Sequence, residues 1–521
     1  MPIINQADTT TTVNINSDDI LYIGADVSVF TTSGYGIHVH STNASPDGEI
    51  YNFGEVVALD NHAMYLTADD TSLFSSGTIL AGGQFNSAVQ LISADNVTFH
   101  NSGLVQSGDY HAIRLSSSDY FTLVNTGTVA SLEGYSINVF ASDNATIVNH
   151  GTITGQIFNQ SGTNFELINY GTMDVDGIAY YAFGTLTSSV ENHGVMGAIQ
   201  GSSGSDDVLN TGTLSSLSLG SGNDEVVNAG TITGNVVLSA GYDTFDGRGG
   251  TVMGYVSGGA DDDTYIIDDA GIDLRESDNN GTDEVRSLVN HTLGSFFENL
   301  TLLGAENLAG GGNDLANILT GNSGHNDLRG YEENDTIDGA AGDDALYGGE
   351  GNDSLIGGYG NDSLFGGDGG DVLAGGTGDD TLMGKAGNDT LKGWKGDDSL
   401  LGGDGNDSLL GADGHDTIYG GTGKDTLVGG DGDDLLTGGL QADTFVFTDG
   451  FGNDTIADFA STWNAEKIDL SGVAAITGFT DLSNNHMSQV GSDVVIDDGA
   501  GNTITLAGVT LGDLDVNDFL F

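Results

Sequence analysis

Aspartate recurs at a fixed interval through the second half of the chain. From residue 335 to residue 443 an Asp stands at every ninth position, and Asn takes the same position at 317 and 326. Carboxylate oxygens are the hard ligands that calcium prefers in proteins, so a regular series of them can hold several ions. The candidate metal ligands of this series are Asp335, Asp344, Asp353, Asp362, Asp371, Asp380, Asp389, Asp398, Asp407, Asp416, Asp425, Asp434 and Asp443.

Glycine and an apolar residue accompany these acids. In most repeats Gly stands two and five residues before the Asp, as in GGEGNDSLI at 348–356. Glycine tolerates positive φ, so it permits a tight turn that exposes main-chain carbonyls beside the carboxylate. Two residues after the acid an apolar side chain always follows, from Leu319 to Phe445, and it would point into a core. A flexible Gly/Asp linker, which the composition alone would allow, does not explain that apolar position.

The repeat has the form G-G-x-G-x-D-x-U-x, which is the calcium-binding nonapeptide repeat of RTX proteins. Over about residues 258–521 the chain resembles that RTX (hemolysin-type) family. The resemblance implies that each nonapeptide forms half a coil of a parallel β-roll, so that Asp residues 18 apart lie on one edge. Seven Asp would then form one ladder and six the other, with at most eleven gaps for Ca²⁺ between neighbouring turns.

A longer repeat occupies the first half of the chain. Segments such as LVNTGTV (123–129) and IVNHGTI (147–153) recur, and their glycines, from Gly54 to Gly230, are 18 to 26 residues apart. This interval is the coil length of a parallel β-helix. Stacked coils would align Asn101, Asn125, Asn149 and Asn169 into a ladder of hydrogen-bonded side-chain amides.

The two repeats merge near the middle of the chain. Acidic glycine turns enter at 204–208, 222–226 and 241–245, and GGADDDTYI at 258–266 reads as one further nonapeptide with Asp263 in the ligand position. These turns predict a short outlying column of calcium ahead of the main array. Its members would be Asp206, Asp224, Asp243 and Asp263.

Together the repeats predict an all-β chain: a right-handed parallel β-helix followed by a calcium-binding parallel β-roll and a small β-rich C-terminal cap. We expect long β-helix coils over 1–200, shorter 18-residue coils with acidic turns over 201–269, an RTX lead-in over 270–315, the RTX β-roll over 316–447, and the cap and secretion region over 448–521. The tail, which ends in Asp518, Phe519, Leu520 and Phe521, resembles the uncleaved signal of proteins exported by type I secretion.

The amino-acid composition excludes several classes of partner and site. The 521 residues include 76 acidic and 10 basic side chains, for a net charge of −66, which excludes nucleic acid as a partner. The absence of Cys excludes disulfides and thiolate zinc sites. No apolar run approaches the roughly 18 residues of a membrane span, so we expect no spanning segment. The N-terminus has no basic region followed by an apolar one, so export would use another route.

These patterns favour a secreted RTX protein, extracellular or associated with the cell surface, whose folding is coupled to calcium after export. Its expected partners are calcium ions and the type I secretion machinery. The N-terminal β-helix would be a structural module or would bind a surface or a polysaccharide. Extracellular calcium-binding modules typically have dissociation constants for calcium of about 10⁻⁴ to 10⁻³ M, so their sites stay empty in a cytosol and fill outside the cell.

The alternative is a polysaccharide-modifying enzyme, an epimerase, lyase or glycosidase, with its active site on the N-terminal β-helix. Mannuronan epimerases resemble this layout, but their Asp-Pro-His motif is missing, and Arg114 is the single basic side chain of residues 1–247. His111 and Arg114, with Asp109 and Tyr110, form the constellation to mutate first, and no catalytic residue is assigned. Candidates for sugar stacking are Tyr180, Tyr181 and Phe183, but we favour their interpretation as half-buried aromatic side chains of a strand.

Overall fold

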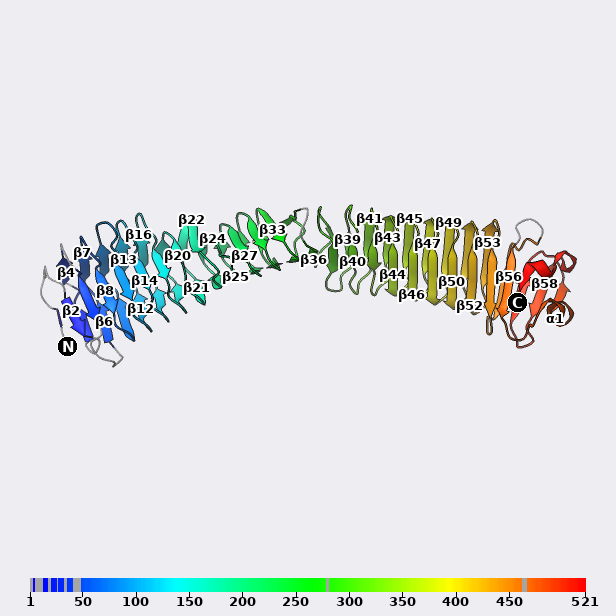
Figure 1. The fold of residues 1–521 in the computed structure, drawn as a ribbon, viewed down its shortest axis with the longest axis horizontal. Coiled ribbons are helices and arrows are strands. Elements are labelled where there is room, and N and C mark those ends of the chain that lie inside the picture. Colours follow the sequence, from blue (N-terminus) through cyan, green and yellow to red (C-terminus); the bar gives the residue numbers. More distant parts are fainter. Residues whose placement is uncertain are drawn as a thin grey trace. The chain divides into compact units, whose positions relative to one another are not determined.

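The computed structural model describes residues 3–4, 13–16, 20–25, 27–31, 35–40, 48–277, 281–461 and 466–521. The chain divides into two compact units, Met1–Gly281 and Thr282–Phe521. Each is built almost entirely of parallel strands stacked coil upon coil (Figure 1), so the predicted all-β solenoid class is confirmed. The boundaries of the five sequence segments stay predictions.

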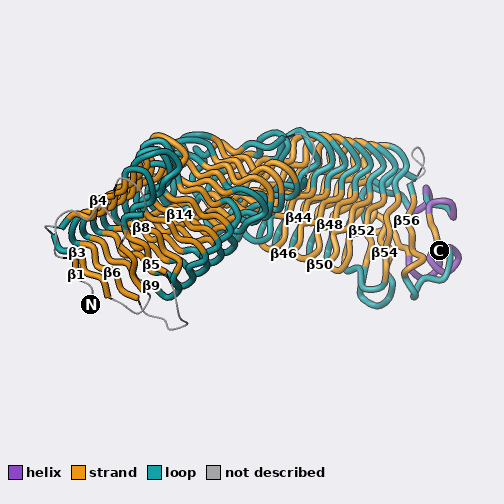
Figure 2. Tube along the Cα trace, turned by 60° about the vertical axis from the view of Figure 1, so that its left-hand side comes forward, coloured by secondary structure: helices purple, strands orange, loops and turns teal. Residues whose placement is uncertain are grey.

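The coils of the first unit contribute strands to three parallel ladders (Figure 2). The first ladder consists of β3 (Ile20–Ile23), β6 (Gly48–Asn52), β9 (Thr71–Ser75), β12 (Thr98–Asn101), β15 (Thr122–Asn125), β18 (Thr146–Asn149), β21 (Phe165–Asn169), β23 (Ser188–Asn192), β25 (Asp206–Asn210), β28 (Glu225–Asn228), β31 (Thr244–Asp246) and β34 (Thr264–Ile267), and β1 (Ile3–Ile4) pairs with β3. The second consists of β4 (Ser28–Thr31), β7 (Glu55–Ala58), β10 (Thr78–Ala81), β13 (Leu104–Ser107), β16 (Thr128–Ser131), β19 (Thr152–Thr154), β22 (Thr172–Ala182), β24 (Val195–Gln200), β26 (Thr213–Leu214), β29 (Thr231–Ile232) and β32 (Thr251–Val252). The third consists of β2 (Val13–Asn16), β5 (Ile37–His40), β8 (Met64–Thr67), β11 (Val89–Ile92), β14 (Ile113–Ser116), β17 (Ile137–Phe140), β20 (Ile157–Asn159), the later parts of β22 and β24, β27 (Leu217–Ser221), β30 (Val236–Ala240), β33 (Tyr255–Ala260) and β35 (Asp273–Leu274).

An Asn-x-Gly corner joins the first ladder to the second. The Asn side chains stack, each Nδ2 donating to the next Oδ1 at 2.8 Å, which confirms the predicted amide ladder and extends it to Asn228. The Gly is required because neighbouring coils touch there: a Cβ on Gly151 would lie 2.1 Å from the carbonyl oxygen of Gly127. Sequence reasoning found this segment but did not divide it into two strands.

The array coils of the second unit contribute two strands each. One ladder consists of β36 (Glu284–Ser287), β38 (Asn299–Leu302), β40 (Ile318–Thr320), β42 (Thr336–Asp338), β44 (Ser354–Tyr359), β46 (Val372–Thr377), β48 (Thr390–Lys395), β50 (Ser408–Asp413), β52 (Thr426–Asp431), β54 (Thr444–Thr448), β56 (Lys467–Gly472) and β60 (Phe519–Leu520). The other consists of β37 (His291–Thr292), β39 (Ala309–Gly311), β41 (Asp327–Tyr331), β43 (Ala345–Glu350), β45 (Ser363–Asp368), β47 (Thr381–Ala386), β49 (Ser399–Asp404), β51 (Thr417–Thr422), β53 (Leu435–Leu440), β55 (Asn453–Ile456) and β59 (Thr503–Leu506).

Register in the array advances by one coil every 18 residues. Leu346 pairs with Leu364, and Leu355 pairs with Leu373, so each nonapeptide forms half a coil as expected. The apolar residue of every repeat, from Leu319 to Phe445, is buried and fills the interior between the two ladders. This single inward column fixes the register, because a slip of one residue would turn every Leu outward.

The end of the second unit forms the predicted β-rich cap. β57 (Met487–Val490) and β58 (Asp493–Asp497) run antiparallel beside β59, and a short helix, α1 (Phe479–Asp481), precedes them. The last strand, β60, pairs with β56, and Phe519 is buried against it. The C-terminal residues thus belong to the fold and cover the last coils, as solenoids require. No helix in the described ranges is long and apolar enough to cross a membrane.

Candidate metal centres

Each turn of the array holds two residues with positive φ, four and two positions before the Asp. Ahead of Asp353 these are Gly349 at 126° and Gly351 at 136°. Where the sequence departs from glycine the backbone keeps the conformation, as at Lys385 (79°) and Ala412 (90°). The stacking of the coils therefore fixes the positive φ, and a residue other than glycine at these positions has a strained backbone.

The Asp residues stand in two columns, one along each edge of the roll. The backbone N–H of Asp353 donates to Oδ1 of Asp371, one coil further on, at 2.8 Å. The same bond recurs at 2.8–2.9 Å along both edges, from Asp335 to Asp443 and from Asp344 to Asp434. One oxygen of every carboxylate thus holds the neighbouring turn in place.

The other oxygen, Oδ2, has no hydrogen-bond partner in any of these thirteen residues, which are at most 3 % exposed. A Cβ added to Gly348 would lie 2.2 Å from Oδ2 of Asp353 and 2.6 Å from the carbonyl oxygen of Gly366, so both oxygens face one space that only glycine leaves open. A buried carboxylate oxygen without a partner is costly, and oxygen atoms converging on one space suit calcium. The donor set therefore fits Ca²⁺.

Burial raises the pKa of these carboxyl groups, and neighbouring acids add to the effect. It brings the pKa of Asp380 and Asp398 to about 7 and that of Asp371 and Asp407 to about 6. Without a cation the columns therefore hold protons at pH values where an ordinary Asp is fully ionised.

The first two repeats differ because their Asn side chains are satisfied by the protein. Nδ2 of Asn317 donates to the carbonyl oxygens of Phe297 and Glu298 at 3.0 and 3.1 Å, and its Oδ1 accepts from the N–H of Asn313. The Asn317 side chain is thus satisfied without a metal ion, so we expect this first repeat to bind calcium more weakly than the Asp repeats.

Sequence reasoning missed one member of the second column, Asp454. The N–H of Asp434 donates to its Oδ1 at 2.9 Å, its Oδ2 is buried without a partner, and burial raises its pKa to about 8. GNDTI at 452–456 carries the repeat pattern, but two inserted residues put it 20 positions after Asp434 and out of register. Beside it, the Asp458 carboxylate accepts the N–H groups of Gly438 and Gly439 and closes the last turn of the other edge.

Arg114 stands apart in the first unit. Four arginines, at 248, 275, 286 and 329, each pair with an acid two residues earlier, whereas Ala112 takes that position before Arg114. Among the described residues Arg114 has no ion-pair partner, its Nε is buried without a hydrogen bond, and its guanidinium lies 5.7 Å from the Tyr110 ring centroid. Burial and this cation lower the pKa of His111 to about 4, so His111 is neutral.

Tyr180 is a buried strand aromatic, as the favoured interpretation of these rings expects, and is not available to stack on sugar. Its ring is 1 % exposed and its hydroxyl lies 2.7 Å from Ser188 Oγ, because the strand turns it into the core. Tyr181 packs on Phe158 with centroids 5.3 Å apart, so one face of its ring is covered. Phe183 is exposed.

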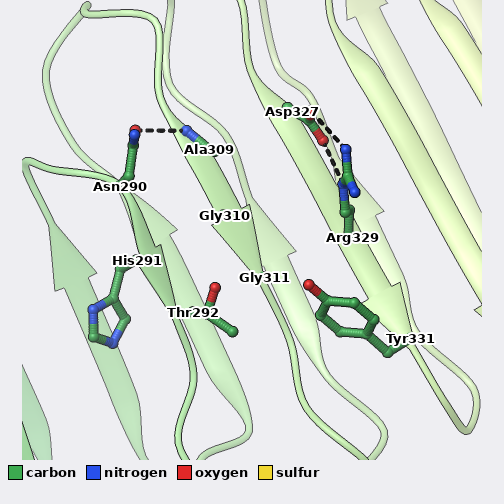
Figure 3. Close-up of a pocket in the computed structure, with 9 residues that line it drawn as sticks. All are labelled: Asn290, His291, Thr292, Ala309, Gly310, Gly311, Asp327, Arg329 and Tyr331. Carbon is green, nitrogen blue, oxygen red and sulfur yellow. Dashed lines mark hydrogen bonds and ion pairs between the residues drawn. The ribbon is translucent and has the colours of Figure 1, made fainter.

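A depression on the second unit lies over β37, β39 and β41 (Figure 3). Gly311 has no side chain to fill it, and a Cβ there would lie 2.9 Å from Oγ1 of Thr292. The Asp327 carboxylate accepts two hydrogen bonds from Arg329, at 2.9 and 3.0 Å, as the dashed lines in Figure 3 show. The charged groups at this surface are thus already paired, and we assign it no chemistry.

Comparison with known proteins agrees with the geometry of the array. Residues 311–445 match, in six overlapping or adjoining stretches, the family described as RTX calcium-binding nonapeptide repeat (4 copies). No curated protein sequence matches the chain. One solved structure similar to part of it is the extracellular lipase LipA from Serratia marcescens, at 20 % identity and a TM-score of 0.19, over 40 % of this chain and 41 % of that one. The chain thus spans less than half of that lipase, and no activity is taken from the likeness.

Proposed function

Because residues 311–445 form an array of RTX calcium-binding nonapeptide repeats, we propose that this is a secreted protein whose β-roll folds when it meets calcium outside the cell. The observation that carries the proposal is the buried Oδ2 without a partner, repeated along both edges. The residues that would hold the ions are the thirteen Asp from 335 to 443, Asp454, and the turn carbonyls that face them.

Charge explains why folding would depend on the ion. Residues 316–447 contain Arg329 and four lysines as their only basic side chains, too few to compensate the buried acids. Without calcium the carboxylates repel one another or take up protons, and each buried orphan oxygen opposes folding. A bound divalent cation supplies the missing charge, so its binding free energy becomes folding free energy.

The coupling of folding to calcium also supports the proposals for how the chain is exported and where the folded protein is located. A chain that stays unfolded at low calcium can pass through a secretion channel, and sites of about 10⁻⁴ to 10⁻³ M affinity would fill only outside. We propose the type I secretion machinery as the partner that exports it, and an extracellular or surface-associated location for the folded protein.

A calcium titration of the full chain tests the coupling. We expect far-UV circular dichroism to show a large gain of β-structure as calcium rises to millimolar concentrations, and little gain with equal magnesium, which demands a tighter octahedral site. A spectrum that is the same with calcium and with chelator contradicts the proposal.

For the N-terminal β-helix we propose binding to a surface or a polysaccharide, supported by Arg114, which has no ion-pair partner among the described residues. A guanidinium group has five N–H donors that can contact sugar hydroxyls. We expect the calcium-loaded chain to be retained on at least one polysaccharide of a glycan array, and retention to be weakened by Arg114→Gln but not by Arg248→Gln, since the Arg248 side chain is exposed and paired with Asp246. Equal retention of both variants contradicts this role, and release of unsaturated or shortened product would indicate the enzyme alternative instead.

A further inference from the structure

Three turns of the first unit have the backbone conformation of the array although they lie outside the matched repeats. Positive φ occurs four and two positions before the acid at Gly220 and Gly222, at Ser239 and Gly241, and at Gly259 and Asp261. The acids that follow these pairs are Asp224, Asp243 and Asp263.

The acids of these turns are linked as in the array. The N–H of Asp206 donates to Oδ1 of Asp224 at 2.8 Å, that of Asp224 to Asp243 at 2.7 Å, and that of Asp243 to Asp263 at 2.9 Å. The coil connections match too: the N–H of Thr244 donates to the carbonyl of Asp224 at 2.8 Å, as Ser354 does to Asp335 at 2.9 Å.

Three of these carboxylates each have one buried oxygen with no hydrogen-bond partner: Oδ1 of Asp206 and Oδ2 of Asp224 and Asp243. The three residues are at most 2 % exposed, and the sequence between Arg114 and Arg248 contains no Lys or Arg to compensate them. These three buried acids stand at successive coils, and the unused oxygen of each suits a cation held between the coils.

We propose that Asp206, Asp224, Asp243 and Asp263 form a second calcium column, on one edge of the first unit. On the same strands the buried positions four residues further on are the neutral Asn210 and Asn228, so the buried acids form a single line. Three gaps separate the four acids, so the column holds two or three ions.

One difference separates this column from the array. Leu219 and Leu238, both buried, take the position where the array turns have their first glycine. In the array a Cβ at that position would touch Oδ2 of the Asp. The leucine side chains therefore leave less room beside Asp224 and Asp243 than glycine leaves beside the Asp residues of the array. We therefore expect these ions to bind more weakly than those of the array, and to leave first as calcium falls.

Calcium counted on the full chain tests the column. Each protein is dialysed to equilibrium against saturating calcium, and its bound calcium is counted by elemental analysis. The double variant Asp224→Asn/Asp243→Asn should carry two or three fewer ions than the wild type. The control, Asp207→Asn/Glu225→Gln, removes the same charge from exposed neighbours on the same strands and should lose none. Unchanged stoichiometry in the first variant overturns the proposal, and so does an equal loss in the control, which would indicate a diffuse counterion layer.

A second measurement leaves the acids intact. Terbium(III) replaces calcium and emits when a nearby tyrosine is excited, and Tyr242 directly precedes Asp243. Tyr242→Phe should lower the terbium emission of the loaded chain, whereas Tyr120→Phe, at an equally exposed tyrosine (59 % for both), should not. Equal emission from the two variants overturns the proposal.

Discussion

The two carboxylate oxygens of each Asp in the array have different roles. Oδ1 accepts the N–H of the preceding coil and so belongs to the fold, while Oδ2 is buried with no partner and faces a space lined by a carbonyl oxygen. The spacing of the acids predicted their columns, because a nine-residue period places every second repeat on the same edge. The division between the oxygens could not be predicted from spacing, since it depends on the turn conformation of the next coil.

The raised pKa values predict how pH acts on the calcium-free protein. A carboxyl whose pKa is higher in the fold than in the unfolded chain stabilises the fold below its ordinary pKa of about 3.9, and that contribution disappears as pH rises through the folded value. For Asp371, Asp380 and Asp454 the folded values are about 6, 7 and 8. Calcium-free protein should therefore show more β-structure by far-UV circular dichroism at pH 5 than at pH 8.

Calcium removes this pH effect, because the ion occupies the oxygens in place of protons. The loaded protein should be at least as stable at pH 8 as at pH 5. Calcium-free samples with the same spectrum at both pH values would show that the buried acids do not oppose folding.

At the scale of the element, glycine and asparagine decide how coils stack. The intervals of the Asn-x-Gly segments predicted a parallel β-helix, and the structure confirms it. The division of that segment into two strands was missed because the bend comes from contact between coils, at Gly127 and Gly151, and not from a local turn signal. Likewise Asp454 fell outside the repeat because the two inserted residues loop out without breaking the column.

Two adjacent glycines test the turn directly. Gly369 has φ of 136°, and a Cβ on it would lie 1.7 Å from the carbonyl oxygen of Gly351, whereas the nearest atom to a Cβ on Gly370 would be 3.2 Å away. Gly369→Ala should lower the calcium-loaded stability by about 3 kcal/mol, and Gly370→Ala by less than about 1 kcal/mol. Denaturant unfolding at fixed calcium measures both, and equal losses would contradict the assigned turn.

The amide ladder can be tested in the same way. Asn149 donates to Asn169 and accepts from Asn125, both at 2.8 Å and fully buried, so Asn149→Ala removes one hydrogen bond from each of two buried neighbours. We expect a loss of about 2–4 kcal/mol. Asn164→Ala removes an exposed amide contact and should cost less than about 1 kcal/mol in the same unfolding experiment; comparable losses would mean that the ladder adds nothing.

At the scale of the whole molecule, two compact units use different polar columns to stack their coils. In the first, neutral amides satisfy one another from Asn101 to Asn228. In the second, acids with unused oxygens run from Asp335 to Asp454. The net charge of −66 is therefore not a sign of disorder, because part of it is buried in register. We propose that this buried charge makes the fold of the second unit conditional on calcium.

Hydrogen exchange of the full chain, followed by mass spectrometry of its peptides with calcium and with chelator, tests this claim most directly. We expect peptides from 327–445 to be protected in millimolar calcium and to exchange almost freely in chelator. Peptides from 98–192, held by the amide ladder, should stay protected in both. Protection of 327–445 that is unchanged by chelator, or a loss of protection that is equal over both ranges, would contradict the account.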